Sequence, residues 1–116
     1  MNRRFRLTRS ADFKRVRRLG TSFAHPLIVL IVYPNELGQP RIAVAASRHV
    51  GKAVKRNRAK RLIRAAIVPL IPLITPGWDI LLIARQPISE ATYLETKQAL
   101  LNVLTRAQLI TKTHVN

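Results

Sequence analysis

Apolar residues near the start of the chain fall on one side of a helix. Phe13, Val16 and Leu19 recur at helical spacing, and basic residues fill most positions between them. Ser10 can serve as the N-cap, and Gly20 suits the position that follows the last turn. The pattern therefore predicts a first helix between these two residues.

Strand patterns follow this helix. The run from Leu27 to Tyr33 is rich in Val and Ile and is bounded by prolines. A second strand runs from Arg41 to Ser47, after a loop of hairpin length at residues 35–40. Residues 22–25 offer one more short strand. The second strand has one face with larger side chains and one with small side chains, namely Ile42, Val44 and Ala46 against Ala43, Ala45 and Ser47.

A long helix and another strand come next. The helix begins at Lys52 or Ala53 and ends at Ile67, because Pro69 prevents its continuation. Residues 68–77 contain three prolines and are expected to form an irregular connection. The run from Trp78 to Ala84 is a strand, and the helix before it favours parallel pairing with the preceding strand. One arc of the helix carries apolar residues that would pack on a sheet, namely Ala59, Leu62, Ile63 and Ala66.

A capping-box pattern, Thr92 with Glu95, predicts where the last helix begins. Its buried stripe is expected at Tyr93, Leu100, Leu104 and Ala107, widened by Leu101 and Val103. The element order is then αβββαβα if the short strand forms. This order predicts an α+β fold, a two-layer α/β sandwich with helices against a small mixed sheet. We expect one domain over residues 1–116, with a basic arm at 1–8 and a frayed tail at 109–116.

Charge narrows the function. The chain has 21 Lys and Arg against five Asp and Glu, a net charge of +16, and no carboxylate between Glu36 and Asp79. Such an excess of one sign indicates a polyanionic partner, above all a nucleic acid. The basic residues concentrate between Arg48 and Arg64, where the predicted helix would carry them as a ridge. The candidate RNA-binding residues are Arg48, Lys52, Lys55, Arg56, Asn57, Arg58, Lys60, Arg61 and Arg64. Asn57 stands out because an amide can contact a base edge or a 2′-hydroxyl group.

Catalytic chemistry has little support in this sequence. Cysteine is absent, and no two carboxylates are spaced as a general acid–base pair. There is no nucleophile motif, no Gly-rich phosphate loop and no zinc spacing, so we expect neither a catalytic residue nor a bound metal on the protein. No apolar run of signal-peptide length follows the basic N-terminus, and none could span a bilayer. The expectation is a cytoplasmic protein without a membrane partner or a small-molecule substrate.

The stretch from Gly51 to Arg64 resembles the signature of the bacterial ribonuclease P protein subunit. That signature is an Arg-Asn-Arg core, here residues 56–58, followed by Lys60-Arg61 and a further Arg. The resemblance continues on both sides of the motif and spans about residues 7–109. It implies a small α+β sandwich in which the strand–helix–strand crossover around the motif is left-handed, an exception to the usual rule.

The resemblance also implies a function. The family assists 5′ maturation of precursor tRNA, as the protein subunit of a ribonucleoprotein endoribonuclease whose catalytic centre and Mg²⁺ ions belong to the RNA subunit. The partners would be the ribonuclease P catalytic RNA and precursor tRNA with its 5′ leader. By resemblance, the motif helix contacts RNA, and a cleft between the first helix and the sheet takes the leader. That cleft is expected to include Phe13, Arg17, Ile31, Tyr33 and Ser47, with Arg17 where many members have an aromatic residue.

Three other interpretations stay open at this point. A ribosomal or ribosome-assembly protein could use the same fold to bind RNA. A metal-dependent nuclease acting alone would need more carboxylates than the chain offers. Binding to a membrane surface would need an exposed apolar helix face, which the motif helix requires for its core.

Overall fold

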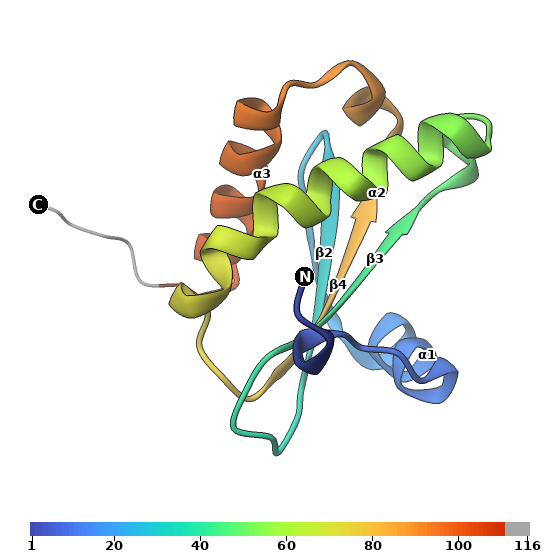
Figure 1. The fold of residues 1–116 in the computed structure, drawn as a ribbon. Coiled ribbons are helices and arrows are strands. Elements are labelled where there is room, and N and C mark those ends of the chain that lie inside the picture. The colour runs from blue at the N-terminus through green and yellow to red at the C-terminus, as the bar shows by residue number, and fades with distance from the viewer. Residues whose placement is uncertain (111–116) are drawn as a thin grey trace, which may run out of the picture.

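The computed structural model describes residues 1–110, and Figure 1 shows their arrangement. Short 3-10 helices cover Arg3–Phe5, Arg48–Val50, Val68–Leu73 and Gln86–Glu90. The main elements are α1 (Ser10–Leu19), β1 (Thr21–Ala24), β2 (Ile28–Pro34), β3 (Arg41–Ala46), α2 (Ala53–Ile67), β4 (Trp78–Ala84) and α3 (Tyr93–Arg106). The predicted order αβββαβα is therefore confirmed, including the short strand near residues 22–25.

The four strands form one mixed sheet in the order β1-β2-β4-β3. β2 pairs with β1 and β4 in antiparallel fashion, and β3 pairs with β4 in parallel, as the strand–helix–strand pattern predicts. In Figure 1, α2 crosses in front of the sheet while β4 lies to the left of β3 and both strands point upward, so this crossover is left-handed. The loop at residues 35–40 is not a hairpin connection, because β4 lies between β2 and β3.

The helices cover the two faces of the sheet unequally. α2 and α3 pack on one face over the main core, which buries Ile28, Leu30, Ile80 and Leu82 from the central strands. α1 lies on the opposite face over a smaller cluster. The two faces predicted for β3 are confirmed. Ile42 and Val44 pack in the main core, and Ala43 and Ala45 belong to the smaller cluster beneath α1. The sheet face beside α1 is therefore only partly covered.

The N-terminal arm is ordered. Its backbone forms a parallel bridge between Arg6 and Ile42, and the Leu7 N–H donates to the carbonyl of Ile42 at 2.8 Å. The Leu7 side chain is buried in the smaller cluster beneath α1. The arm thus covers the beginning of the otherwise open edge of β3.

Several local predictions at helix ends were wrong. Ser10 is the first residue of α1 and makes no side-chain cap, because the helix begins one residue earlier than expected and Arg9 takes the N-cap position. Leu19, at the end of α1, is 54% exposed because the smaller cluster is filled from Phe13 and Val16. Pro69 ends α2, as predicted, but the chain continues as a 3-10 helix, since proline is tolerated in the first turn.

The last helix keeps its capping box but shifts its buried stripe. The Thr92 hydroxyl accepts from the Glu95 N–H at 3.1 Å, and Glu95 accepts from the Thr92 N–H at 2.9 Å. The residues of the first turn are exposed, including Tyr93, so the buried stripe begins one turn later. The buried residues are Thr96, Ala99, Leu100, Val103 and Leu104.

The chain after α3 does not fray where we expected. Gln108 adopts the left-handed conformation, and the Leu109 N–H donates to the carbonyl of Leu104 at 2.9 Å, as in a Schellman motif. Leu109 is 1% exposed, and its carbonyl accepts from the Thr75 N–H at 2.7 Å. The rest of the predicted tail, residues 111–116, lies outside the described residues.

The packing around Gly20 leaves no room for a side chain. A methyl group there would lie 2.5 Å from the Val16 carbonyl oxygen and 2.6 Å from Ile31 Cγ2. We expect Gly20→Ala to lower the free energy of unfolding by about 1–3 kcal/mol, because α1 must move away from the sheet. Gly38→Ala is the matched control, since no atom lies within 4 Å of the added methyl group. Urea unfolding of both variants is the measurement, and equal stabilities would contradict the close packing of α1.

Candidate nucleic-acid interface

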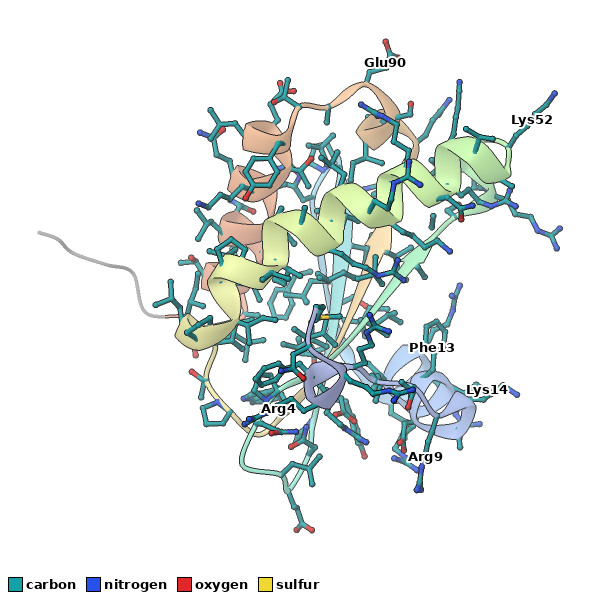
Figure 2. All side chains as sticks on the ribbon, in the orientation of Figure 1. Arg4, Arg9, Phe13, Lys14, Lys52 and Glu90 are labelled. Carbon is teal, nitrogen blue, oxygen red and sulfur yellow. The ribbon has the colours of Figure 1, made fainter. Side chains whose placement is uncertain are left out.

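The basic ridge is the exposed face of α2 together with the turn before it. Gly51 permits this entry to the helix because it adopts φ 136°, a conformation that side chains rarely take. The ridge contains Arg48, Lys52, Lys55, Asn57, Arg58 and Arg61, which are exposed, and Arg56, Lys60 and Arg64, which are half-buried. Figure 2 shows Lys52 projecting away from the body of the protein at the beginning of α2. The structure thus places the nine predicted RNA-binding residues on α2 and the turn before it, and leaves six of them exposed.

The opposite side of α2 holds the ridge rigid. Ala59, Ile63, Ala66 and Ile67 are buried against the sheet and α3, whereas Leu62 from the predicted apolar arc is only half-buried. Ile67, which the predicted arc did not include, is buried with them.

Two arginines of the ridge also fix its position. The Arg56 guanidinium donates to the Gly51 carbonyl at 2.8 Å, and the Arg58 guanidinium donates to the Ser89 carbonyl at 2.9 Å. A guanidinium has five N–H donors, so each retains donors for a phosphate.

Among the residues that the structure describes, no carboxylate forms an ion pair with the ridge. Within residues 1–110 the ion pairs join Arg15 to Asp12, and Arg41 to both Asp12 and Asp79. The ridge therefore presents a field of one sign, which is the electrostatic requirement for binding a phosphate backbone.

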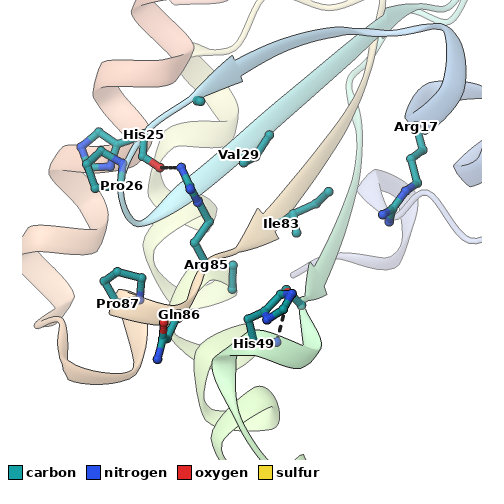
Figure 3. A pocket seen from close by; sticks show the side chains of 12 residues that line it. Arg17, His25, Pro26, Val29, His49, Ile83, Arg85, Gln86 and Pro87 are labelled. Carbon is teal, nitrogen blue, oxygen red and sulfur yellow. Dashed lines mark hydrogen bonds between the residues drawn. The ribbon is translucent and has the colours of Figure 1, made fainter.

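A cleft of about 830 Å³ lies on the sheet face that α1 leaves open (Figure 3). Its floor is apolar, because Val29 and Ile83 are direct partners in the β2–β4 register. Arg17 reaches it from α1 and Arg85 from the end of β4, on opposite sides of the view in Figure 3. Ser47 lines the cleft at the end of β3. The cleft thus combines a flat apolar floor with a cation at each side.

The predicted leader residues divide between different places. Arg17 and Ser47 line this cleft, and their role in binding a leader stays a prediction. Ile31 is only 7% exposed beneath α1, and Tyr33 is half-buried in the same cluster, so neither lines it. Phe13 lines a separate groove beside β3. The reason is that α1 itself covers the part of the sheet that carries Ile31 and Tyr33.

Other residues of the cleft were missed from the sequence. Arg85 follows β4 directly, and its guanidinium donates to the His25 carbonyl at 3.2 Å. The His49 N–H donates to the Ser47 hydroxyl at 3.1 Å. Strand alternation places Val29 and Ile83 on the same face as Ile31, but only the strand order makes the two residues neighbours.

His25 contributes no charge to the cleft at neutral pH. Burial lowers the pKa of its imidazole, and the nearby Arg106 guanidinium lowers the pKa further. Its Nδ1 atom accepts from the Leu27 N–H at 3.0 Å, which places the ring proton on Nε2. The positive charge of the cleft therefore comes from Arg17 and Arg85.

An ion-pair network ties α1 to the sheet and so shapes the cleft. Arg41 donates through Nε and Nη2 to the two carboxylate oxygens of Asp79, each at 2.8 Å. Its Nη1 atom lies 3.3 Å from Asp12 of α1, which also accepts from Arg15 at 2.8 Å. The Asn35 side-chain amide donates to Asp79 at 2.8 Å. Asp79, 1% exposed, is therefore fully partnered.

The pKa values follow from this network. Burial raises the pKa of the Asp12 carboxyl, but the hydrogen bond from Arg15 and the charge of Arg41 outweigh it, and the net pKa is lowered. The hydrogen bond with Asp79 raises the pKa of Arg41 against the opposing effect of burial. Both groups are thus held in their charged forms.

Comparison with known proteins decides the family. The family model described as Ribonuclease P matches residues 1–108. The chain belongs to the ribonuclease P protein family. A ribonuclease P protein component from Herpetosiphon aurantiacus is 38% identical over 109 residues, which are 94% of this chain and 89% of the relative. One from Geobacillus sp. strain WCH70 is also 38% identical, over 92% of this chain and 93% of the relative.

Solved structures of ribonuclease P proteins share the fold. The Staphylococcus aureus protein at 2.0 Å superposes with a TM-score of 0.81 and 33% identity, over 92% of this chain and 98% of that chain. The Thermotoga maritima protein gives a TM-score of 0.78 and 30% identity, over 87% and 96%. The family resemblance and the α+β fold expected from the motif are therefore confirmed. The ribosomal alternative is not favoured.

The ion pairs of Asp12 predict a pH dependence of stability. Because the pKa of Asp12 is lower in the folded state, its contribution is present above the unfolded pKa of about 4 and is lost as pH falls through the folded pKa. Asp12→Asn should therefore be less stable than the parent at pH 7, with a difference that shrinks as the pH falls. Urea unfolding across this range is the measurement.

Glu36→Gln is the control for this prediction, since Glu36 is an exposed carboxylate in a loop and joins none of the ion pairs within residues 1–110. Its pH profile should follow that of the parent. A constant difference between Asp12→Asn and the parent at every pH would show that the ion pairs contribute nothing.

Proposed function

We propose that this member of the ribonuclease P protein family is an RNA-binding subunit that assists a catalytic RNA in removing the 5′ leader of precursor tRNA. The observation that carries the proposal is the ridge of α2, a rigid face of unneutralised cations beside a separate cleft. A protein that only bound one RNA would need the ridge alone. The two surfaces together suit a subunit that holds a catalytic RNA and its substrate at once.

The ridge binds the catalytic RNA in this proposal. Arginine suits the task because its planar guanidinium matches a phosphate with two parallel hydrogen bonds. Exposed Asn57 stands among these cations, where its amide can contact a base edge or a 2′-hydroxyl group. The helix is held on three sides by its core residues and by the bonds of Arg56 and Arg58, so little conformational entropy is lost on binding.

The cleft binds the leader as a single strand. Its apolar floor at Val29 and Ile83 can receive the faces of bases, and Arg17 and Arg85 can hold the phosphates on either side. Without an aromatic ring on this floor, base stacking is weaker here than on an aromatic platform. Binding in the cleft should therefore rest more on phosphate contacts and should depend little on leader sequence.

The chemical step belongs to the RNA in this proposal. Asp12 and Asp79 are occupied by arginines, and residues 1–110 contain no group of three His, Cys, Asp or Glu that fits a metal ion. We therefore assign Mg²⁺ to the catalytic RNA and the precursor. The protein's part is electrostatic, since its cations replace counterions between two polyanions and so reduce the Mg²⁺ that they need.

No helix within residues 1–110 is long and apolar enough to cross a membrane.

The direct experiment is cleavage of precursor tRNA by the cognate catalytic RNA at low Mg²⁺, with and without the protein. We expect the protein to stimulate cleavage, and the stimulation to be larger for a precursor with a long leader than for one with a single leader nucleotide. Arg85→Gln should remove the dependence on leader length and keep the stimulation of the short precursor. No stimulation of either precursor would refute the proposed function.

The ridge is tested by the salt dependence of binding to the catalytic RNA. Arg61→Gln should weaken binding and reduce the slope of log K against log salt by about 0.7–0.9, the value of one lost phosphate contact. Lys97→Gln removes the same charge from α3, away from the ridge, and should leave the slope unchanged. If both variants alter the slope equally, the ridge has no special role.

A further inference from the structure

The outer side of α1 carries a second group of cations, separate from the ridge. Lys14, Arg15 and Arg18 share this side, because residues three and four positions apart are neighbours on a helix surface. All three are exposed, whereas Val16 is fully buried on the side that faces the sheet. We call these three residues the α1 cation face.

A depression of about 530 Å³ lies among these cations. Ala11 lines it, and its small side chain leaves the space between the longer cationic side chains open. Leu19 borders the depression at the end of the helix and is 54% exposed. None of the described residues that line it is aromatic. The α1 cation face therefore surrounds a hollow with positive charge but offers no ring on which a base could stack.

Little negative charge opposes this face. Asp12 is the one carboxylate of α1, and it pairs with Arg15 at 2.8 Å and with Arg41 at 3.3 Å. Lys14 and Arg18 join none of the ion pairs within residues 1–110. These two cations can therefore bind an external anion, and the Arg15 guanidinium keeps N–H donors beyond the one that Asp12 accepts.

The α1 cation face and the ridge point in different directions. α2 packs on one face of the sheet and α1 on the opposite face (Figure 1). Each helix turns its apolar side toward the sheet and its cations outward. Figure 2 shows Lys14 and Lys52 projecting from separate parts of the molecule. Because the sheet lies between the two helices, an RNA helix that lies along the ridge does not cover the α1 cation face.

We propose that the α1 cation face binds the phosphate backbone of a double-stranded RNA segment, one that the ridge does not hold. Lys14 and Arg18 lie one helical turn apart, about 6 Å along the axis, and contact successive phosphates of one strand. Arg15 contacts the same backbone from the other side of the depression. The protein then joins two RNA segments, one on each face of its sheet.

A duplex suits this face better than a single strand does. Proteins that bind single strands combine cations with aromatic rings on which the bases stack, and the lining of this face has no such ring. A duplex keeps its bases stacked inside and presents phosphates and 2′-hydroxyl groups. A membrane surface fits less well, because a helix that lies on a membrane needs an exposed apolar side, and that side of α1 packs on the sheet.

The duplex can come from the catalytic RNA or from a stem of the precursor tRNA, since both offer the same backbone. The inference deepens the proposed function and rests on it for the identity of the RNA. Binding of a duplex to this face can nevertheless be measured without any cleavage reaction.

The experiment is lysine acetylation of the full chain, read by mass spectrometry, with a blunt RNA duplex of arbitrary sequence as the probe. We expect the duplex to slow acetylation of Lys14 by about threefold or more, in addition to that of Lys52 in the ridge. Lys97 of α3 is the internal control and should keep its rate. Arg18→Gln should restore most of the rate at Lys14 and leave the protection of Lys52 unchanged.

Arg3→Gln is the matched control variant. It removes one exposed charge outside the α1 cation face and should leave the protection of Lys14 unchanged. The proposal is overturned if Lys14 keeps its rate at duplex concentrations that protect Lys52, or if Arg18→Gln has no more effect than Arg3→Gln. Protection of Lys14 by vesicles of anionic phospholipid, but not by the duplex, would also overturn it.

The same measurement on the protein bound to the cognate catalytic RNA identifies the source of the duplex. Protection of Lys14 by the catalytic RNA alone assigns the duplex to that RNA, whereas protection that begins only when precursor tRNA is added assigns it to the precursor. Protection in neither complex refutes the second surface. A protein whose Lys14 is protected but which does not stimulate cleavage would refute the proposed function alone.

Discussion

The partly buried ion pair between Arg41 and Asp79 is the interaction on which the arrangement of α1 and the sheet depends. It joins the adjacent strands β3 and β4, and through Asp12 it extends to α1. Because α1 is fixed at one end of the sheet, the rest of that face stays open as the cleft that Arg17, Ser47 and Arg85 line. One charged cluster thus sets the position of the helix that borders this cleft.

The same cluster explains the charge of the surface. The chain has five Asp and Glu residues. The network takes Asp12 and Asp79, and the Glu95 side chain accepts a hydrogen bond from the Thr92 N–H at the start of α3. Few carboxylates are left to neutralise the cations on the surface of the protein. The core, in turn, must be apolar and well packed to hold a fold that carries such repulsion, and Leu30, Ile63, Leu82 and Leu100 are fully buried at its centre.

Local patterns predicted the helices and strands well, but they could not predict which residues become neighbours across the sheet. The alternation in β3 and the apolar arc of α2 follow from helix and strand periods, which are properties of neighbouring residues. The pairing of Arg41 with Asp79 spans 38 positions and depends on the parallel register. The floor of the cleft depends in the same way on the pairing of Val29 with Ile83. The family resemblance assigned Phe13 to the leader cleft, and only the packing of α1 on the sheet shows that Phe13 lies outside the cleft between Arg17 and Arg85.

The strand order has a consequence for how the chain folds. β2 and β3 follow one another through a loop short enough for a hairpin, yet β4, made much later in the sequence, lies between them. A β2–β3 hairpin would form quickly from local contacts, and it would be a trap, because it must open before β4 can insert. Productive folding therefore requires that β2 does not pair with β3 before β4 has taken its place between them. The rate-limiting event should be the closure of the long connection through α2, a step that no local propensity can accelerate.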